Sequence, residues 1–169
     1  MFDRLIDFLV DFIDLFRFWT IVMPYEEGVV IRLGKYKKTV TAGWWLIWPF
    51  NIDQVLKANV VPTTLDLGEQ SVTTADGQSV VVRAFLTWSI FDVRKLLLEV
   101  EDHEDALNDV ASGYIAQAIA EAAWEEVSAA DFCDGLKPAI QKRARKWGIS
   151  VKNVQFSDCT RSKSLRLFN

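Results

Sequence analysis

The chain has 169 residues, of which 50% are hydrophobic and 12% aromatic, and its formal net charge is −4 at pH 7. This length suits one domain with an appended segment, and so apolar a composition excludes an intrinsically disordered chain. A net negative charge argues against a general nucleic-acid-binding protein, which normally has a basic excess, so no nucleic-acid partner is expected.

Residues 1–23 are expected to form an amphipathic helix that ends before Pro24. On a helix with about 100° per residue, the four aspartates of this segment fall within an arc of roughly 80°, and Arg4 and Arg17 lie at its edges. Most of the remaining circumference is apolar. We expect this apolar face to contact a membrane through Phe2, Leu5, Phe8, Leu9, Phe12, Phe16 and Trp19.

Three arrangements of this helix fit the pattern. It lies in the plane of a membrane with its apolar face down; it assembles with copies of itself in the membrane, with the aspartates facing inward; or it packs on its own soluble domain. Helices that lie in the membrane plane usually carry Lys and Arg on the polar face, whereas this one is acidic. The attraction is therefore expected to be mainly hydrophobic.

The segment "TAGWWLIWPF", residues 41–50, holds three tryptophans, Trp44, Trp45 and Trp48. In an extended segment Trp44 and Trp48 share one side and Trp45 lies on the other, with Ile47. A core position for all three therefore requires that both sides be covered. The alternative is that one side packs inward while the other meets a bilayer interface, where an indole satisfies both its apolar body and its N–H group. We therefore include Trp44, Trp45 and Trp48 among the residues expected to contact a lipid bilayer, with at least one of them at the interface.

Residues 28–91 are predicted to form an antiparallel sheet. Strands are expected at 28–34, 51–60, 63–74 and 78–91, with a polar connection at 35–43. Asp76 and Gly77 predict a hairpin turn in which both residues have positive φ.

The second half of the chain changes to a helical period. Helices are expected at 93–100, at 104–127, and from a capping-box-like start at Ser128 to a stop at Gly148, with Pro138 inside the last one. Residues 149–158 alternate as a final strand. Strands, then helices, then one strand predict an α+β fold.

Four segments in this order resemble the SPFH domain, also called Band 7, of stomatins, prohibitins and flotillins. They are "EEGVVIRLGKY", "AGWWLIWPFNIDQV", "QSVTTADGQSVVVRAFLTWSIFD" and "RKWGISVKNVQFSD". The resemblance covers about residues 24–158, between the expected N-terminal anchoring helix at 1–23 and a tail at 159–169. It implies a membrane-bound homo-oligomeric scaffold, a ring or cage, that organises a membrane patch or controls partner membrane proteins.

Two features depart from the family pattern. Family chains usually continue into a long coiled coil, whereas this sequence ends at Asn169, so a closed, walled cage is not expected. Ala42 stands where the family often has proline, which predicts a less rigid loop before Gly43.

No catalytic centre or cofactor is expected. The chain has one histidine, His103, within an acidic segment; a solvated helix start and a metal site are both compatible with that setting. No nucleophile motif, metalloprotease motif or phosphate-binding glycine loop is present. Cys133 and Cys159 form no Cys-x-x-Cys motif, so two buried free thiols are expected, although spacing alone does not exclude a disulfide.

Two oppositely charged segments, 99–105 and 137–146, are either solvated helix faces or contacts between copies of the chain. The apolar end of the tail is expected to dock on the same or a neighbouring copy. The expected oligomer interface comprises Glu101, Asp102, Glu104, Arg143, Arg145, Lys146, Leu165, Leu167 and Phe168.

Three functions remain open at this point: a membrane scaffold that contacts bilayer and copies of itself, a regulator that restrains one unidentified membrane enzyme or channel, and a soluble enzyme or ligand-binding domain whose tryptophans line a pocket. Arg32, Lys35, Lys37 and Lys38 favour an anionic leaflet, and hence the cytoplasmic face of a membrane.

Overall fold

The computed structural model describes residues 18–129 and 131–162, which divide into two compact units. The first holds residues 18–61 and 93–99, and the second holds 62–92 together with the described residues from 100 onward. The helix expected at the N-terminus therefore lies, up to residue 17, outside the described residues.

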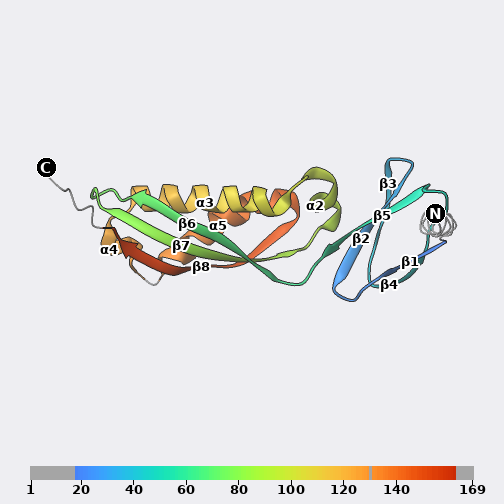
Figure 1. Cartoon of the computed structure of the whole chain (residues 1–169), viewed down its shortest axis with the longest axis horizontal. Helices are drawn as coiled ribbons and strands as arrows, with labels where there is room; N and C mark the ends of the chain where they lie inside the picture. Colours follow the sequence, from blue (N-terminus) through green and yellow to red (C-terminus); the bar gives the residue numbers. More distant parts are fainter. Residues whose placement is uncertain (1–17, 130, 163–169) are drawn as a thin grey trace, which may run out of the picture. The chain divides into compact units, whose positions relative to one another are not determined.

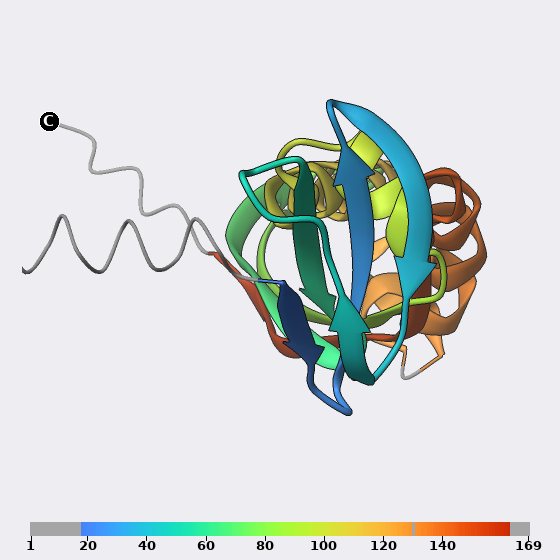
Figure 2. The same ribbon diagram turned by 90° about the vertical axis from the view of Figure 1, so that its right-hand side faces the viewer.

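The first unit is built from five strands in two antiparallel sheets. A two-stranded ribbon pairs β1 (Trp19–Val22) with β4 (Gly43–Leu46). A three-stranded sheet has the order β3-β2-β5, with β2 at Glu26–Arg32, β3 at Lys35–Val40 and β5 at Asp53–Asn59 (Figure 1, Figure 2). Helix α2 (Val93–Glu99) packs on β2 and β5.

Two expectations for this unit were wrong. Residues 19–22 are not the end of a helix but strand β1, in which Ile21 pairs with Trp44 and Trp19 with Leu46. Their sequence, "WTIV", has three β-branched residues in a row, a composition that favours a strand once a partner strand is available. Residues 35–40 are not a loop but strand β3, because pairing with β2 satisfies their backbone despite polar side chains.

The core of the first unit is a small valine cluster. Val22, Val30 and Val40 are almost fully buried, and Trp45 and Val55 pack against them. Each of these side chains comes from a different strand, so the cluster joins the ribbon to the three-stranded sheet.

The second unit is an antiparallel sheet covered by helices on one face. Its strand order is β6-β7-β8, with β6 at Thr63–Thr73, β7 at Ser79–Ile90 and β8 at Ile149–Arg161. Helix α3 (His103–Glu121) packs on β6, and α5 (Phe132–Ala144) packs on β8 and on α3 (Figure 1). Alternate residues of β7 are buried: Val80, Val82, Ala84, Leu86 and Trp88.

The α+β order, with antiparallel strands, helices and a final strand, is confirmed, but three details differ. The strands of residues 28–91 belong to separate sheets in two units. The helix expected at 104–127 is broken, since Ala122 is extended and a short helix α4 (Trp124–Val127) follows. Ser128 ends α4 by donating to the carbonyl of Glu125 and does not cap α5, which continues through Pro138.

The expected hairpin at residues 74–78 is confirmed, with a different turn. Gly77 N–H donates to the Thr74 carbonyl at 2.9 Å, and only Gly77 has positive φ, 76°. Thr74 N–H in turn donates to the Gln78 carbonyl at 2.9 Å. This is a type I turn followed by a left-handed residue, so Asp76 needs no positive φ.

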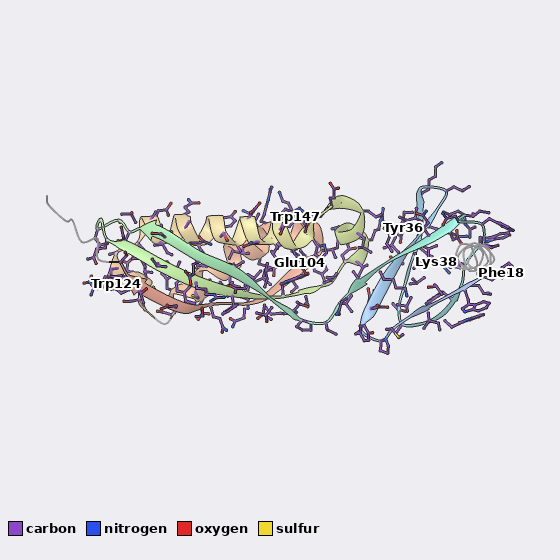
Figure 3. All side chains as sticks on the ribbon, in the orientation of Figure 1. Phe18, Tyr36, Lys38, Glu104, Trp124 and Trp147 are labelled. Atoms are coloured by element: carbon purple, nitrogen blue, oxygen red, sulfur yellow. The ribbon has the colours of Figure 1, made fainter. Side chains whose placement is uncertain are left out.

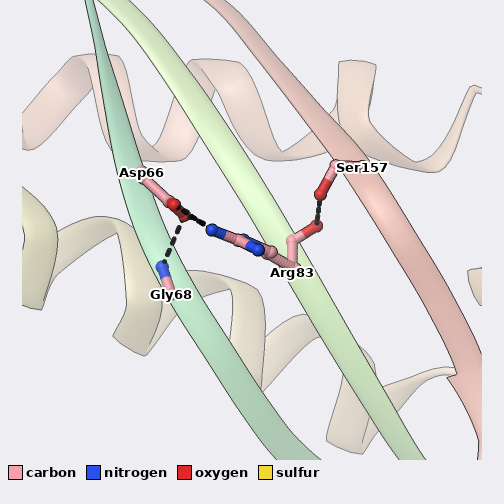
Figure 4. A network of polar contacts seen from close by, with 4 residues as sticks. All are labelled: Asp66, Gly68, Arg83 and Ser157. Carbon is pink, nitrogen blue, oxygen red and sulfur yellow. Dashed lines mark hydrogen bonds and ion pairs between the residues drawn. The ribbon is translucent and has the colours of Figure 1, made fainter.

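The register of the second sheet is held by side chains on its open face (Figure 4). Strand β6 shifts register between Asp66 and Glu69, where Gly68 has φ of 72° and donates to the Asp66 carboxylate at 3.0 Å. Arg83 on β7 pairs with the same carboxylate at 2.5 Å, and Ser157 on β8 donates to the Arg83 carbonyl at 3.3 Å. One cluster therefore links all three strands.

Gly148 ends the last helical turn, as expected, with φ of 78°. A Cβ atom at this position would lie 2.3 Å from the Asp92 carbonyl oxygen, which no other residue tolerates. The Gly148 carbonyl accepts the N–H groups of Phe91 and Asp92, and so joins the end of β7 to the start of β8.

Candidate functional site

One face of the β1–β4 ribbon consists of exposed apolar side chains. Alternation along each strand and the register of the pair place Trp19 beside Leu46 and Ile21 beside Trp44. All four are about half exposed or more: Trp19 49%, Ile21 50%, Trp44 60% and Leu46 64%. We call these four residues the ribbon face. Contiguous exposed apolar side chains of this kind mark interaction surfaces in proteins.

The opposite face of the ribbon packs inward. Thr20 and Val22 are buried, and Trp45 packs on the valine cluster while its indole N–H donates to the Thr41 carbonyl at 2.8 Å. Lys38 lies over the Trp45 ring at 4.5 Å. The expectation that Trp44 and Trp45 point to opposite sides is therefore confirmed.

The turn that follows β4 extends the apolar surface. Trp48 is 59% exposed and Phe50 is 53% exposed. Phe50 and Asn51 have φ of 60° and 59°, a backbone region that is rare for a bulky aromatic residue. Such strain persists only where the surrounding structure imposes it, and it is concentrated at functional sites.

The Asp53 carboxylate holds this turn in place through hydrogen bonds. Its carboxylate accepts two hydrogen bonds from Arg32, at 2.6 and 2.8 Å, and a third from the Trp48 backbone N–H at 3.0 Å. The Arg32 hydrogen bonds, and then the one from Trp48, hold the pKa of Asp53 at about 2. Arg32 also lies 5.6 Å from the Trp48 ring centroid, so the ion pair supports the indole as well as the backbone.

A cavity of about 530 Å³ opens beside this turn. Its apolar wall includes Phe18, Leu46, Ile47, Trp48, Pro49, Phe50 and Ile52, and its charged side is formed by Arg32 with its partner Asp53 and by Lys37 and Lys38. We call it the turn pocket. Figure 3 labels two residues that line the pocket: Phe18, which directly precedes β1, and Lys38, which lies in β3. The volume lies within the range of small-molecule sites.

The residues of the second unit that were predicted to form the interface between copies are all exposed. Glu101, Asp102 and Glu104 lie at the start of α3, where the Asp102 carboxylate caps the helix by accepting from the Asp105 N–H at 3.3 Å. Arg143, Arg145 and Lys146 lie at the end of α5 and in the short helix η1 (Arg145–Trp147). Within residues 18–129 and 131–162, no ion pair joins the two groups inside one copy.

Several predicted residues lie outside the described part of the chain. From the N-terminal segment these are Phe2, Leu5, Phe8, Leu9, Phe12 and Phe16, and from the tail they are Leu165, Leu167 and Phe168. Among the helices that the structure describes, none has the length and apolarity to cross a bilayer.

His103 and the two cysteines are the residues that the sequence singled out for chemistry. His103 lies edge-on to Trp88, with ring centroids 5.6 Å apart, and no metal-binding cluster of three ligands occurs among the described residues. Cys133 and Cys159 are free thiols, as expected, but they are half-buried and not fully buried.

Sequence reasoning missed part of the candidate site. Ile21, Leu46 and Phe50 were not expected to share a surface with Trp44, because residues 19–23 were assigned to a helix. A signal for a strand was present in "WTIV", because three consecutive β-branched residues favour a strand over a helix.

Comparison with known proteins places the chain among proteins of one domain family. An uncharacterized protein of Methanothermobacter thermautotrophicus is 30% identical over 154 residues, which cover 90% of this chain and 48% of the relative. A stomatin homolog of Pyrococcus horikoshii is 26% identical, over 82% of this chain and 52% of the relative. Stomatin-like protein 1 of Homo sapiens is 24% identical, over 81% of this chain and 35% of the relative.

The chain thus spans about half, or less, of the length of these three relatives. The model of the family itself matches residues 20–166, which include every strand and helix described above apart from the first residue of β1. This chain belongs to the SPFH domain / Band 7 family.

Proposed function

We propose that the protein is a membrane-associated homo-oligomeric scaffold that organises a patch of bilayer. The observation that carries this proposal is the ribbon face, in which four large apolar side chains stand together and exposed. Family membership and the stomatin relatives support it. The ribbon face is the surface through which the folded domain meets the membrane.

The energetics favour a hydrophobic attachment. Fully burying one large apolar side chain contributes about 1.5–3 kcal/mol, so even the half-exposed residues of the ribbon face together contribute several kcal/mol. Trp19 and Trp44 suit the headgroup region in particular, because an indole has an apolar body and a polar N–H group. Attractions between exposed charges are weaker at physiological ionic strength, where the Debye length is about 8 Å.

The basic residues of β3 indicate which kind of leaflet is bound, since Lys37 and Lys38 line the same cavity as Leu46 of the ribbon face. Lys35 and Lys37 are exposed and Lys38 is half-buried, all on β3. A lysine near an anionic membrane surface contributes about 1 kcal/mol. We therefore assign the protein to an anionic leaflet, as on a cytoplasmic face.

Assembly would use the second unit. The acidic start of α3 and the basic end of α5 are both exposed and are not paired with each other in the described part of one copy. When an acidic segment of one copy meets the basic segment of the next, the contact is head-to-tail and a ring can close.

Flotation with liposomes tests the membrane part of this proposal. The chain is expected to float with neutral phosphatidylcholine vesicles in low and high salt and to be released by detergent. Replacing Ile21 and Trp44 with serine should weaken flotation, because the segment before the ribbon is expected to contact the membrane as well, whereas the same change at Tyr114 and Leu98, which are also exposed, should leave it unchanged. Complete release of the unmodified chain by high salt alone contradicts a hydrophobic attachment.

A further inference from the structure

The turn pocket combines features that the membrane attachment by itself does not require. Its wall is apolar, and Leu46 belongs both to this wall and to the ribbon face, so the two surfaces are continuous. A surface that only rests on a bilayer needs no cavity of about 530 Å³. A cavity continuous with a membrane-facing surface is positioned to receive a single lipid chain.

The charges of the pocket select the kind of lipid. Arg32 is already neutralised by Asp53, with its Nε 2.6 Å from the carboxylate. Lys37 and Lys38 remain as cations at the pocket. Asp53 also lines the pocket and its charge acts on Lys37, but among the described residues no carboxylate forms an ion pair with either lysine. Two adjacent lysines beside an apolar cavity complement a ligand that has an apolar tail and an acidic head.

A β-bulge places both lysines at the same cavity. Adjacent residues of a regular strand point to opposite faces. Here Val30 pairs with Lys38 and Ile31 with Tyr36, so Lys37 is an extra residue without a partner on β2. Bulges redirect side chains in this way and are common beside functional sites. In β3 the bulge allows Lys37 and Lys38 to line one pocket.

We propose that the turn pocket holds one acyl chain of an anionic membrane phospholipid, with the acidic headgroup bound by Lys37 and Lys38. This inference rests on the proposed membrane attachment and adds lipid selectivity to it. The ribbon face attaches the protein to the bilayer whatever the charge of the lipid headgroups. The turn pocket then binds one anionic lipid of the leaflet.

Photo-crosslinking of the full chain on vesicles tests the inference. The vesicles are phosphatidylcholine with a small fraction of phosphatidylglycerol that carries a photoactivatable group on one acyl chain; matched vesicles carry the same group on phosphatidylcholine. Mass spectrometry should find labelled peptides from residues 47–52 with the phosphatidylglycerol probe, above the level for the phosphatidylcholine probe. Added inorganic phosphate should not reduce this labelling, because the acyl chain contributes to binding.

Two variants and a matched control make the test specific. Replacing Lys37 and Lys38 with glutamine should reduce phosphatidylglycerol labelling by about fivefold for each lysine, down to the phosphatidylcholine level. Replacing Lys137 and Lys152 with glutamine removes the same charge from the second unit and should leave labelling unchanged. Ile52→Trp, which fills the cavity, should reduce labelling of the pocket with both probes while flotation persists; its thermal melt checks folding.

The outcomes separate this inference from the proposed function. If the chain floats but residues 47–52 are labelled equally by both probes, or are not labelled, the pocket is not an anionic-lipid site and the membrane attachment stands. If inorganic phosphate alone suppresses labelling, the pocket is a simple anion site and the inference is wrong. If the chain does not float on vesicles at all, the proposed function itself fails.

Discussion

Arg32 and Asp53 face each other across β2 and β5, and their ion pair lies directly beneath the exposed aromatic turn. The guanidinium donates two hydrogen bonds to the carboxylate, whose second oxygen also accepts the Trp48 N–H at 3.0 Å. One carboxylate thus connects the three-stranded sheet to the segment that presents Trp48 and Phe50. Rigid support of this kind allows a turn with strained backbone to persist.

Asp53→Asn should therefore destabilise the protein. The change removes a charged acceptor from Arg32, and a hydrogen bond to a charged group contributes about 2 kcal/mol. The pKa of Asp53 is lowered from 3.8 to about 2. Because the folded protein binds this proton less tightly than the unfolded chain, the stabilisation is present above about pH 4 and is lost as the pH falls toward 2.

Thermal unfolding from pH 7 to pH 2 measures this contribution. The difference in melting temperature between the unmodified protein and Asp53→Asn should shrink as the pH falls through this range. Asp66 is the matched control, since it also pairs with an arginine across two strands but is 41% exposed. Asp66→Asn should have the smaller effect, because solvent screens an exposed pair. Equal effects of the two changes would contradict the supporting role of Asp53.

Phe50→Asn should separate membrane binding from stability. Asparagine tolerates a positive φ better than phenylalanine does, so the free energy of unfolding should stay constant or rise by about 0.5 kcal/mol. Vesicle affinity should fall by about fivefold, since the half-exposed ring no longer enters the interface.

Leu33→Asn provides the control for this change. Leu33 is also exposed with positive φ, 48°, but it lies in the turn between β2 and β3. It should gain stability without losing vesicle affinity. A loss of affinity that is the same for both variants would show that exposed apolar area in general, and not the aromatic turn, drives binding.

Reversing the basic end of α5 should disperse the assembly. The change replaces Arg143, Arg145 and Lys146 with glutamate, which then faces the acidic start of α3 in the next copy. Reversing Glu101, Asp102 and Glu104 to lysine in the same chain should partly restore the larger assembly. Light scattering coupled to size-exclusion chromatography in mild detergent measures the particle mass, and an unchanged mass for the first reversal would exclude these segments as the interface.

The two thiols should react slowly. Burial raises the pKa of Cys133 and also that of Cys159, so less thiolate is present near neutral pH than in an exposed cysteine. Since the folded state favours the protonated thiols, it should lose stability as the pH rises above their usual pKa. Alkylation by iodoacetamide at pH 8, followed by mass spectrometry, should be slower than in the denatured chain; equal rates would contradict the effect of burial.

The sequence predicted local features better than their assembly. Strands β6 and β7 and the end of the last helix at Gly148 were recognised because alternation, an Asp-Gly turn and a left-handed glycine are local signals. The division into two units was missed, since the packing of α2 on β2 and β5 depends on contacts far apart in the sequence.

The candidate site was predicted in part for the same reason. Alternation separated Trp44 from Trp45 correctly. Trp19 and Ile21 join the ribbon face only because β1 pairs with β4, and Lys37 lines the turn pocket together with Lys38 at a β-bulge. The partner of a strand and the position of a bulge cannot be recognised in a single sequence.

The central claim, that the ribbon face enters the membrane, is tested most directly by tryptophan quenching in vesicles that contain brominated lipids. Single Trp→Phe changes assign the quenched signal to individual residues. Changes at Trp44 and Trp19 should each remove part of the quenching, whereas changes at Trp45, which packs inward, and at Trp147 in the second unit should not. Quenching that survives the changes at Trp19 and Trp44 undiminished would show that the ribbon face does not touch lipid.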